Sequence, residues 1–185
     1  KDNSPKKDIY QNFAQILARK KMLSLMECLL SSTHLDYFRR YRKRLDEIQN
    51  FELGHGKDHP LRVLMLTTFI ADKLELSAEA LETLYKAVCF HDAGRVNGLM
   101  DPKHGALGAR WYHEHYGEDK EVEFLIKFHS LDDDIAARNL KEMDFTNKEE
   151  LWLLYQILKD ADALDRVRFK YYGNEALNEK FLRLD

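Results

Sequence analysis

Residues 77–92 have the sequence SAEALETLYKAVCFHD, which is the pattern of one amphipathic helix. Its apolar face consists of Leu81, Leu84 and Val88. Residues three and four positions apart share one face of a helix. Ser77 is a typical N-cap residue, and acidic residues follow it in the first turns. His91 continues the apolar face, so the pattern predicts a helix that carries an imidazole into the core at its C-terminal end.

Apolar residues follow the same helical spacing along most of the chain. Further helices are predicted over about 8–30, 34–49, 59–74, 106–116, 119–129 and 147–170, with a last one after Gly173. Glycine and proline cluster in two predicted loops, FELGHGKDHP (51–60) and AGRVNGLMDPKHG (93–105). No stretch alternates as a strand would. The sequence therefore predicts an all-α chain, with residues 1–50 as a helical N-terminal extension and residues 51–185 as the main domain.

The composition fits one globular domain of ordinary size, with 185 residues, 44% of them hydrophobic and 33% charged. No apolar run reaches about 18 residues, so no membrane span is expected. The net charge of −3 gives no reason to expect nucleic acid as a partner. Because the chain begins with Lys1, we expect a trimmed or processed product, and the removal of a targeting segment stays open.

The two cysteines, Cys28 and Cys89, both lie in apolar, helix-like stretches. We expect them to be reduced core residues rather than a disulfide. Reduced cysteines are typical of the cytoplasm, so an intracellular, cytoplasmic protein is predicted.

Three histidines each lie on the apolar face of a different predicted helix. His59 shares its face with Val63, Leu66 and Ile70, His91 with Leu81, Leu84 and Val88, and His129 with Val122, Leu125 and Ile126. A single such histidine is most simply a core residue bonded to a backbone carbonyl. Three of them, with Asp92 beside His91, favour a metal centre, because a divalent cation offsets the cost of burying imidazoles and carboxylates. Nitrogen and oxygen ligands suit Mn²⁺, Fe²⁺, Zn²⁺ or Ni²⁺ better than Ca²⁺, and Mg²⁺ is a further candidate.

A further ligand is expected from the segment DADALDR (160–166). Asp162 shares a helical face with Leu151, Tyr155 and Leu158, whereas Asp160 shares one with Leu153 and Ile157. Spacing alone does not separate the two aspartates. A solvated helix end is the alternative explanation for the whole acidic cluster.

Five segments, in this order, have the residues of a known family: HGKDHPLRV (55–63), FHDAGR (90–95), DPKHG (101–105), FHS (128–130) and DADALDR (160–166). Together they resemble the HD superfamily of metal-dependent phosphohydrolases. The resemblance implies an HD-type hydrolase domain over 51–185, with metal ligation by His59, His91, Asp92 and Asp162. It thereby selects Asp162 over Asp160.

The resemblance also places His104 and His129 where binuclear members, such as cyclic-dinucleotide phosphodiesterases of the HD-GYP type, carry ligands for a second metal. The chain departs from that group at Arg95, where the group has lysine, and it has no GYP segment. Cyclic dinucleotides are therefore not expected as substrates. The HGxxHxxRV motif at the start of the match is similar to that of small bacterial HD proteins. This resemblance implies the type of reaction but does not identify the substrate.

The implied reaction is hydrolysis of a nucleotide or related phosphoester, because a metal-bound water is a nucleophile near neutral pH and phosphate oxygens need cationic partners. Arg62 and Arg95 are predicted to face the phosphate. Lys103 is a third candidate, for which a surface salt bridge is an equal alternative. His55, in a glycine-flanked loop, is a hypothetical proton donor to the leaving group. Other catalytic candidates are Asp92, His104 and His129.

Two other functions stay open. With His104 and His129, the six-residue set also resembles HD-type di-iron oxygenases, which oxidise a C–H bond with the same cage. A non-catalytic interaction module is the other alternative, with the basic run RRYRKR (Arg39 to Arg44) as a contact for a phosphate-bearing partner. A solvated helix face explains that run more simply. Surface positions are expected for His34, His113 and His115, and a helix start for Asp132 to Asp134.

Overall fold

A computed structural model describes residues 24–47, 58–74, 76–95, 103–165 and 182–184. Its regular elements are α2 (Ser32–Glu47), α3 (Asp58–Ala71), α4 (Ala78–Phe90), α5 (His104–Tyr116), α6 (Lys120–Phe128), α7 (Asp133–Glu142) and α8 (Lys148–Asp165). Residues 24–29 are also helical, and no strand occurs within these ranges. The predicted all-α fold is confirmed.

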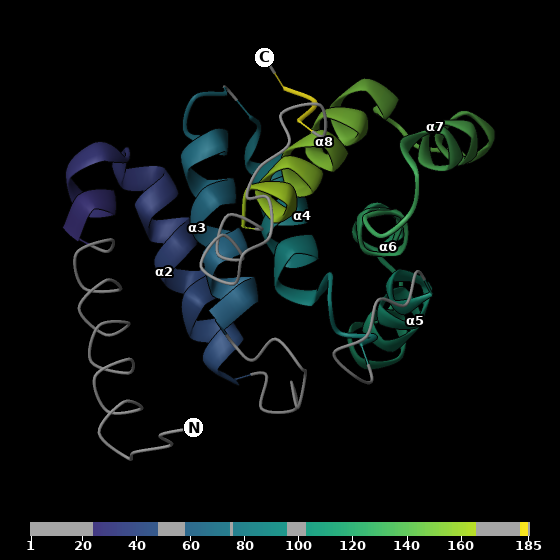
Figure 1. The fold of residues 1–185 in the computed structure, drawn as a ribbon, viewed down its shortest axis with the longest axis horizontal. Helices are drawn as coiled ribbons and strands as arrows, with labels where there is room; N and C mark the ends of the chain where they lie inside the picture. Colours follow the sequence, from purple (N-terminus) through teal and green to yellow (C-terminus); the bar gives the residue numbers. More distant parts are fainter. Residues whose placement is uncertain (1–23, 48–57, 75, 96–102, 166–181, 185) are drawn as a thin grey trace, which may run out of the picture.

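Helix α4 lies in the middle of the fold and packs against α2, α3, α5, α6 and α8 (Figure 1). A helix surrounded in this way must be apolar on several sides. Accordingly, Leu84, Ala87, Val88, Cys89 and Phe90 are all fully buried, although they lie on different faces of the helix. The stretch SAEALETLYKAVCFHD therefore forms the central element against which its neighbours are placed.

Two pairs of helices lie on different sides of α4. Helices α2 and α3 pack together on one side, and α5 packs on α6 on the other (Figure 1). Helix α8 contacts both groups, because it packs against α3, α4 and α6. This arrangement brings together the ends of helices that are far apart in the sequence.

Local signals at the helix ends agree with the structure in two places and differ in two others. Ser77 caps α4, where its Oγ accepts a hydrogen bond of 3.0 Å from the backbone N–H of Ala80. Asp119 caps α6 in the same way through Val122. Helix α5 begins at His104, two residues before the predicted start. For α7 only the start at Asp132 to Asp134 was predicted and not the extent, because its buried face consists of Ala136 and Leu140 alone.

Two expectations about single side chains need correction. Cys28 is exposed, because Met26 lies on the inward face of residues 24–29 and Cys28 lies more than half a turn away from it. Cys89 is buried as expected, and both cysteines are free thiols. His34 is not a surface residue, because its side chain is only 13% exposed beside Asp72. The helix start expected at Asp132 to Asp134 is confirmed, because Asp132 directly precedes α7 and the other two lie in its first turn, although Asp132 makes no side-chain capping bond and Asp133 accepts a bond from Tyr155.

Several predictions fall outside the described residues: the helix before residue 24, the helix after Gly173, and the loop that contains His55. The boundary at residue 50 stays a prediction, although α2 packs on α3 and α4. Among the described helices, none is both long and apolar enough to cross a membrane.

Candidate metal centre

Four histidines and two aspartates meet where five helices end or begin. His59 lies in the first turn of α3, His91 and Asp92 directly follow α4, His104 begins α5, His129 directly follows α6, and Asp162 lies in the last turn of α8. All are at most 5% exposed except Asp162, whose side chain is 21% exposed. The cluster is therefore buried, and Asp162 is its most exposed member.

Two sets of three possible ligands overlap in this cluster. His59, His91 and Asp162 form one set, and His91, Asp92 and His129 form the other, with ligand atoms within 4.8 Å of one another in each. In the first set, the Nε2 atom of His59 lies 3.2 Å from both the Nε2 atom of His91 and the Oδ1 atom of Asp162. His91 belongs to both sets, which makes it the common residue of the cluster.

Asp92 belongs to the second set and links it to His59 of the first set and to His104. Its Oδ2 atom is 3.4 Å from Nε2 of His59, and its Oδ1 atom is 3.3 Å from Nε2 of His104. His104 and His129 in turn approach each other, with their Nε2 atoms 3.0 Å apart. A carboxylate in this position can serve two cations or one.

The tautomers of three histidines follow from the hydrogen-bond partner of Nδ1, the ring nitrogen that faces away from the cluster. The Nδ1 atoms of His91 and His129 lie 2.7 Å from the backbone oxygens of Val88 and Ile126. A carbonyl oxygen only accepts, so each Nδ1 carries the proton and each Nε2 presents a lone pair to the cluster. His59 donates from Nδ1 to Asp165 over 2.7 Å. Lone pairs of His59 and His91 at 3.2 Å repel unless positive charge lies between them.

Protonation also favours cation binding here. Burial lowers the pKa of His91 to about 4, despite the neighbouring carboxylate of Asp92. Burial alone would raise the pKa of Asp92 and Asp162, but the surrounding histidines outweigh it and hold both below the usual range. Neutral imidazole and ionised carboxylate are the forms that bind metal ions. The donor set therefore fits a divalent cation.

A comparison with protein families decides the assignment. The family model of the HD domain matches residues 56–167, more than half of the chain. The chain belongs to the HD domain family. Neither the curated proteins nor the solved structures contain a match to it. Family membership supports a metal-dependent, hydrolase-type function, and the match includes α3 to α8 with all six residues of the cluster.

The two aspartates that helical spacing could not separate lie in different surroundings in the HD domain. Asp162 reaches the cluster. Asp160 is equally part of α8 and is buried, but its oxygens accept bonds from the backbone N–H groups of Arg183 and Leu184 at 2.8–2.9 Å. The acidic segment is thus not a solvated helix end, because both Asp160 and Asp165 are less than 5% exposed.

The arginines expected to face a phosphate are bound to carboxylates of the HD domain. Arg95 donates from Nε to Oδ1 of Asp92 over 2.6 Å, and Arg62 donates from Nε to Oδ1 of Asp165 over 2.5 Å. Either arginine would have to share its partner in order to contact a substrate. Lys103 lies exposed directly before α5.

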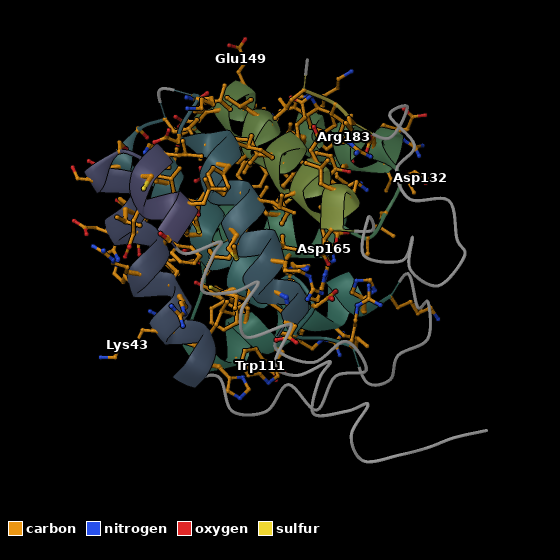
Figure 2. All side chains as sticks on the ribbon, turned by 60° about the vertical axis from the view of Figure 1, so that its left-hand side comes forward. Lys43, Trp111, Asp132, Glu149, Asp165 and Arg183 are labelled. Atoms are coloured by element: carbon orange, nitrogen blue, oxygen red, sulfur yellow. The ribbon has the colours of Figure 1, made fainter. Side chains whose placement is uncertain are left out.

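Two features of the HD domain were not predicted from the sequence. Asp165 contacts His59, and it lies inside the helix assembly while Lys43 and Trp111 lie at its edge (Figure 2). Its spacing from Asp162 could have indicated its position, because residues three apart on one helix lie close together. The second feature is the close approach of α5 at Gly94, where a Cβ atom would lie 2.2 Å from the backbone oxygen of His104.

Proposed function

We propose that this HD domain is a metal-dependent phosphohydrolase or phosphodiesterase that hydrolyses a nucleotide or a related phosphoester. The observation that carries the proposal is the convergence of lone-pair nitrogens and carboxylates, within 4.8 Å in each set, at a buried point where only the Asp162 side chain is partly exposed. A cation bound there would supply the positive charge that hydrolysis of a phosphoester needs.

The ligand roles follow from the positions of the side chains. His59, His91, Asp92 and Asp162 would hold a first cation, and His104 and His129 would join Asp92 around a second. Candidates are Mn²⁺, Fe²⁺, Zn²⁺, Ni²⁺ and Mg²⁺. A bound divalent cation supplies Lewis acidity, which activates water near neutral pH and offsets the charge on phosphate oxygens.

The chain's own residues contribute orientation and charge. The carbonyls of Val88 and Ile126 hold two histidine rings, so little reorganisation is needed when a ligand binds. Arg95 lies against Asp92 with its side chain 18% exposed, and Arg62 is 38% exposed. Both can therefore present remaining N–H groups to phosphate oxygens. Lys103 remains a third candidate for phosphate contact, and His55 remains a candidate proton donor outside the described residues.

The test combines metal content with turnover. The full chain is purified without chelators, its metals are counted per chain, and phosphomonoesters, phosphodiesters and nucleotides are assayed with Mn²⁺, Ni²⁺ or Fe²⁺. His91→Ala is expected to lose the bound metal and the activity. His113→Ala is the matched control, because this exposed histidine pairs with Glu123 away from the cluster. A chain with neither bound metal nor activity would contradict the proposal.

The second ligand set favours one other candidate function. Because Asp92, His104 and His129 could hold a second cation, a di-iron oxygenase that oxidises a C–H bond is the alternative. Two irons per chain, oxygen consumption and no turnover of any phosphoester would support it. A folded chain that holds metal but catalyses neither reaction would instead support a non-catalytic interaction module, with Arg39 to Arg44 as its contact surface.

A further inference from the structure

Asp165 lies on the side of His59 that faces away from the other histidines. Its Oδ2 atom is 2.7 Å from Nδ1 of His59, and its side chain is only 3% exposed. The opposite nitrogen of the same ring, Nε2, is the one that lies 3.2 Å from His91 and from Asp162. The ring of His59 is thus held between a carboxylate behind it and the cluster in front.

Arg62 is a second partner of this carboxylate. Its Nε donates to Oδ1 over 2.5 Å, and its Nη2 atom lies 3.4 Å from Oδ2. Arg62 follows His59 by three residues on α3, so both side chains lie on one face of that helix. A buried carboxylate is costly unless it is paired, and Arg62 supplies the compensating charge.

His59 depends on this contact in a way that His91 and His129 do not. His91 and His129 donate from Nδ1 to a backbone carbonyl three residues earlier, so their own chain segment sets their tautomer. His59 lies at the start of its helix, and its acceptor is a side chain 106 residues later in the sequence. The tautomer of His59 is therefore set by the packing of α8 on α3.

We infer that Asp165 is a positioning residue, which holds His59 in the Nδ1–H tautomer and turns its Nε2 lone pair toward the cation, with Arg62 as its counter-ion. The inference rests on the proposed metal centre. In this arrangement Asp165 does not contact the cation. Arg62 binds the carboxylate of Asp165, and this contact does not require a bound substrate.

Asp165→Asn is the decisive substitution, because it keeps the shape and changes the hydrogen-bonding capacity. An amide has one acceptor oxygen and one donor NH₂, whereas Arg62 and His59 both donate to the carboxylate. The charged Arg62 is expected to retain the oxygen. The NH₂ group then faces Nδ1 of His59, which must accept, so the ring proton moves to Nε2 and blocks the ligating nitrogen.

The first measurement is calorimetric titration of the full, chelator-treated chain with Mn²⁺ alone. Asp165→Asn is expected to bind Mn²⁺ about 10–100-fold more weakly than the wild type, as for other partners of metal-ligating histidines. Asp160→Asn is the matched control, because Asp160 lies on the same helix, is equally buried and binds residues 183–184 instead. This control is expected to keep the wild-type affinity for Mn²⁺, whatever its effect on stability.

The second measurement is the histidine ring spectrum by ¹⁵N NMR without metal. His59 is expected as the Nδ1–H tautomer in the wild type and as the Nε2–H tautomer in Asp165→Asn, a change that a merely structural role would not produce. Unchanged Mn²⁺ affinity in a folded Asp165→Asn chain would overturn the inference alone. So would an Nε2–H tautomer of His59 in the wild type, a result that needs no variant to fold. A wild-type chain that binds no Mn²⁺, Zn²⁺ or Fe²⁺ would overturn the proposed function together with the inference.

Discussion

Gly94 follows Asp92 by two positions, and its lack of a side chain determines how closely α5 can approach. A Cβ atom at this position would lie 2.2 Å from the backbone oxygen of His104 and 2.3 Å from the backbone nitrogen of Gly108. Backbone atoms cannot rotate away as a side chain can. The same contact places His104 beside Asp92, so one glycine links the packing of α5 to the geometry of the cluster.

Gly94→Ala is therefore expected to destabilise the chain by about 2–3 kcal/mol, as other overpacking substitutions do. Urea unfolding followed by circular dichroism measures the change. Gly108→Ala provides a graded comparison, because its Cβ atom would lie 3.1 Å from the nearest backbone atom and needs a shift of only a few tenths of an ångström. Equal stability of Gly94→Ala and the wild type would mean that α5 is free to move away.

At the scale of helices, Asp72 joins the end of α3 to the start of α2. Its Oδ1 atom accepts a bond of 3.0 Å from the backbone N–H of Ser31 and lies 3.3 Å from Nδ1 of His34. The bond from Ser31 lowers the pKa of this carboxyl, and burial opposes it more weakly. The ionised form of Asp72 therefore stabilises the contact between the two helices.

The sign of the pH dependence follows from the lowered pKa. A carboxyl with a folded-state pKa below the unfolded value stabilises the fold above about pH 4, and this stabilisation is lost as the pH falls through the folded-state pKa. Asp72→Asn is thus expected to be less stable than the wild type at pH 7, with a difference that shrinks at pH 3. Urea unfolding at both pH values tests this. Asp36→Asn, at a side chain that is 76% exposed, should show no such trend.

At the scale of the whole molecule, the cluster is the place where five helices are joined. Its ligands come from α3, α5 and α8 and from the residues after α4 and α6, so a cation would connect both sides of the central helix. Such a ligand binds only the folded chain and must stabilise it by mass action.

Mn²⁺ at about 100 times its dissociation constant is expected to add about 2.7 kcal/mol to the free energy of unfolding of the wild type. Thermal unfolding with Mn²⁺ and with a chelator measures this effect. His91→Ala should lose most of it, because His91 belongs to both ligand sets, whereas His113→Ala should keep it. An equal shift in the wild type and in His91→Ala would place the binding site elsewhere.

Local spacing was sufficient for much of the fold and for part of the cluster. The helical rhythm predicted α4 and its cap at Ser77, and it placed His59, His91 and His129 on apolar faces, where all three are buried. The extent of helix α7 was not predicted, because a helix with two buried residues leaves almost no periodic signal. The expectation for Cys28 failed because an apolar stretch does not indicate which of its faces is covered.

Short-range bonds and side-chain periodicity act within a few residues, and for this reason the sequence by itself determined the helices and the inward direction of the histidines. Which carboxylate meets which histidine depends on how helices pack. Asp160 and Asp162 have similar neighbours in sequence, yet Asp160 is covered by residues 183–184 and Asp162 faces His59. Asp165 and His59 are 106 residues apart. Only the tertiary structure decided these pairings, because they arise where α8 lies on α3 and from no local pattern in either helix.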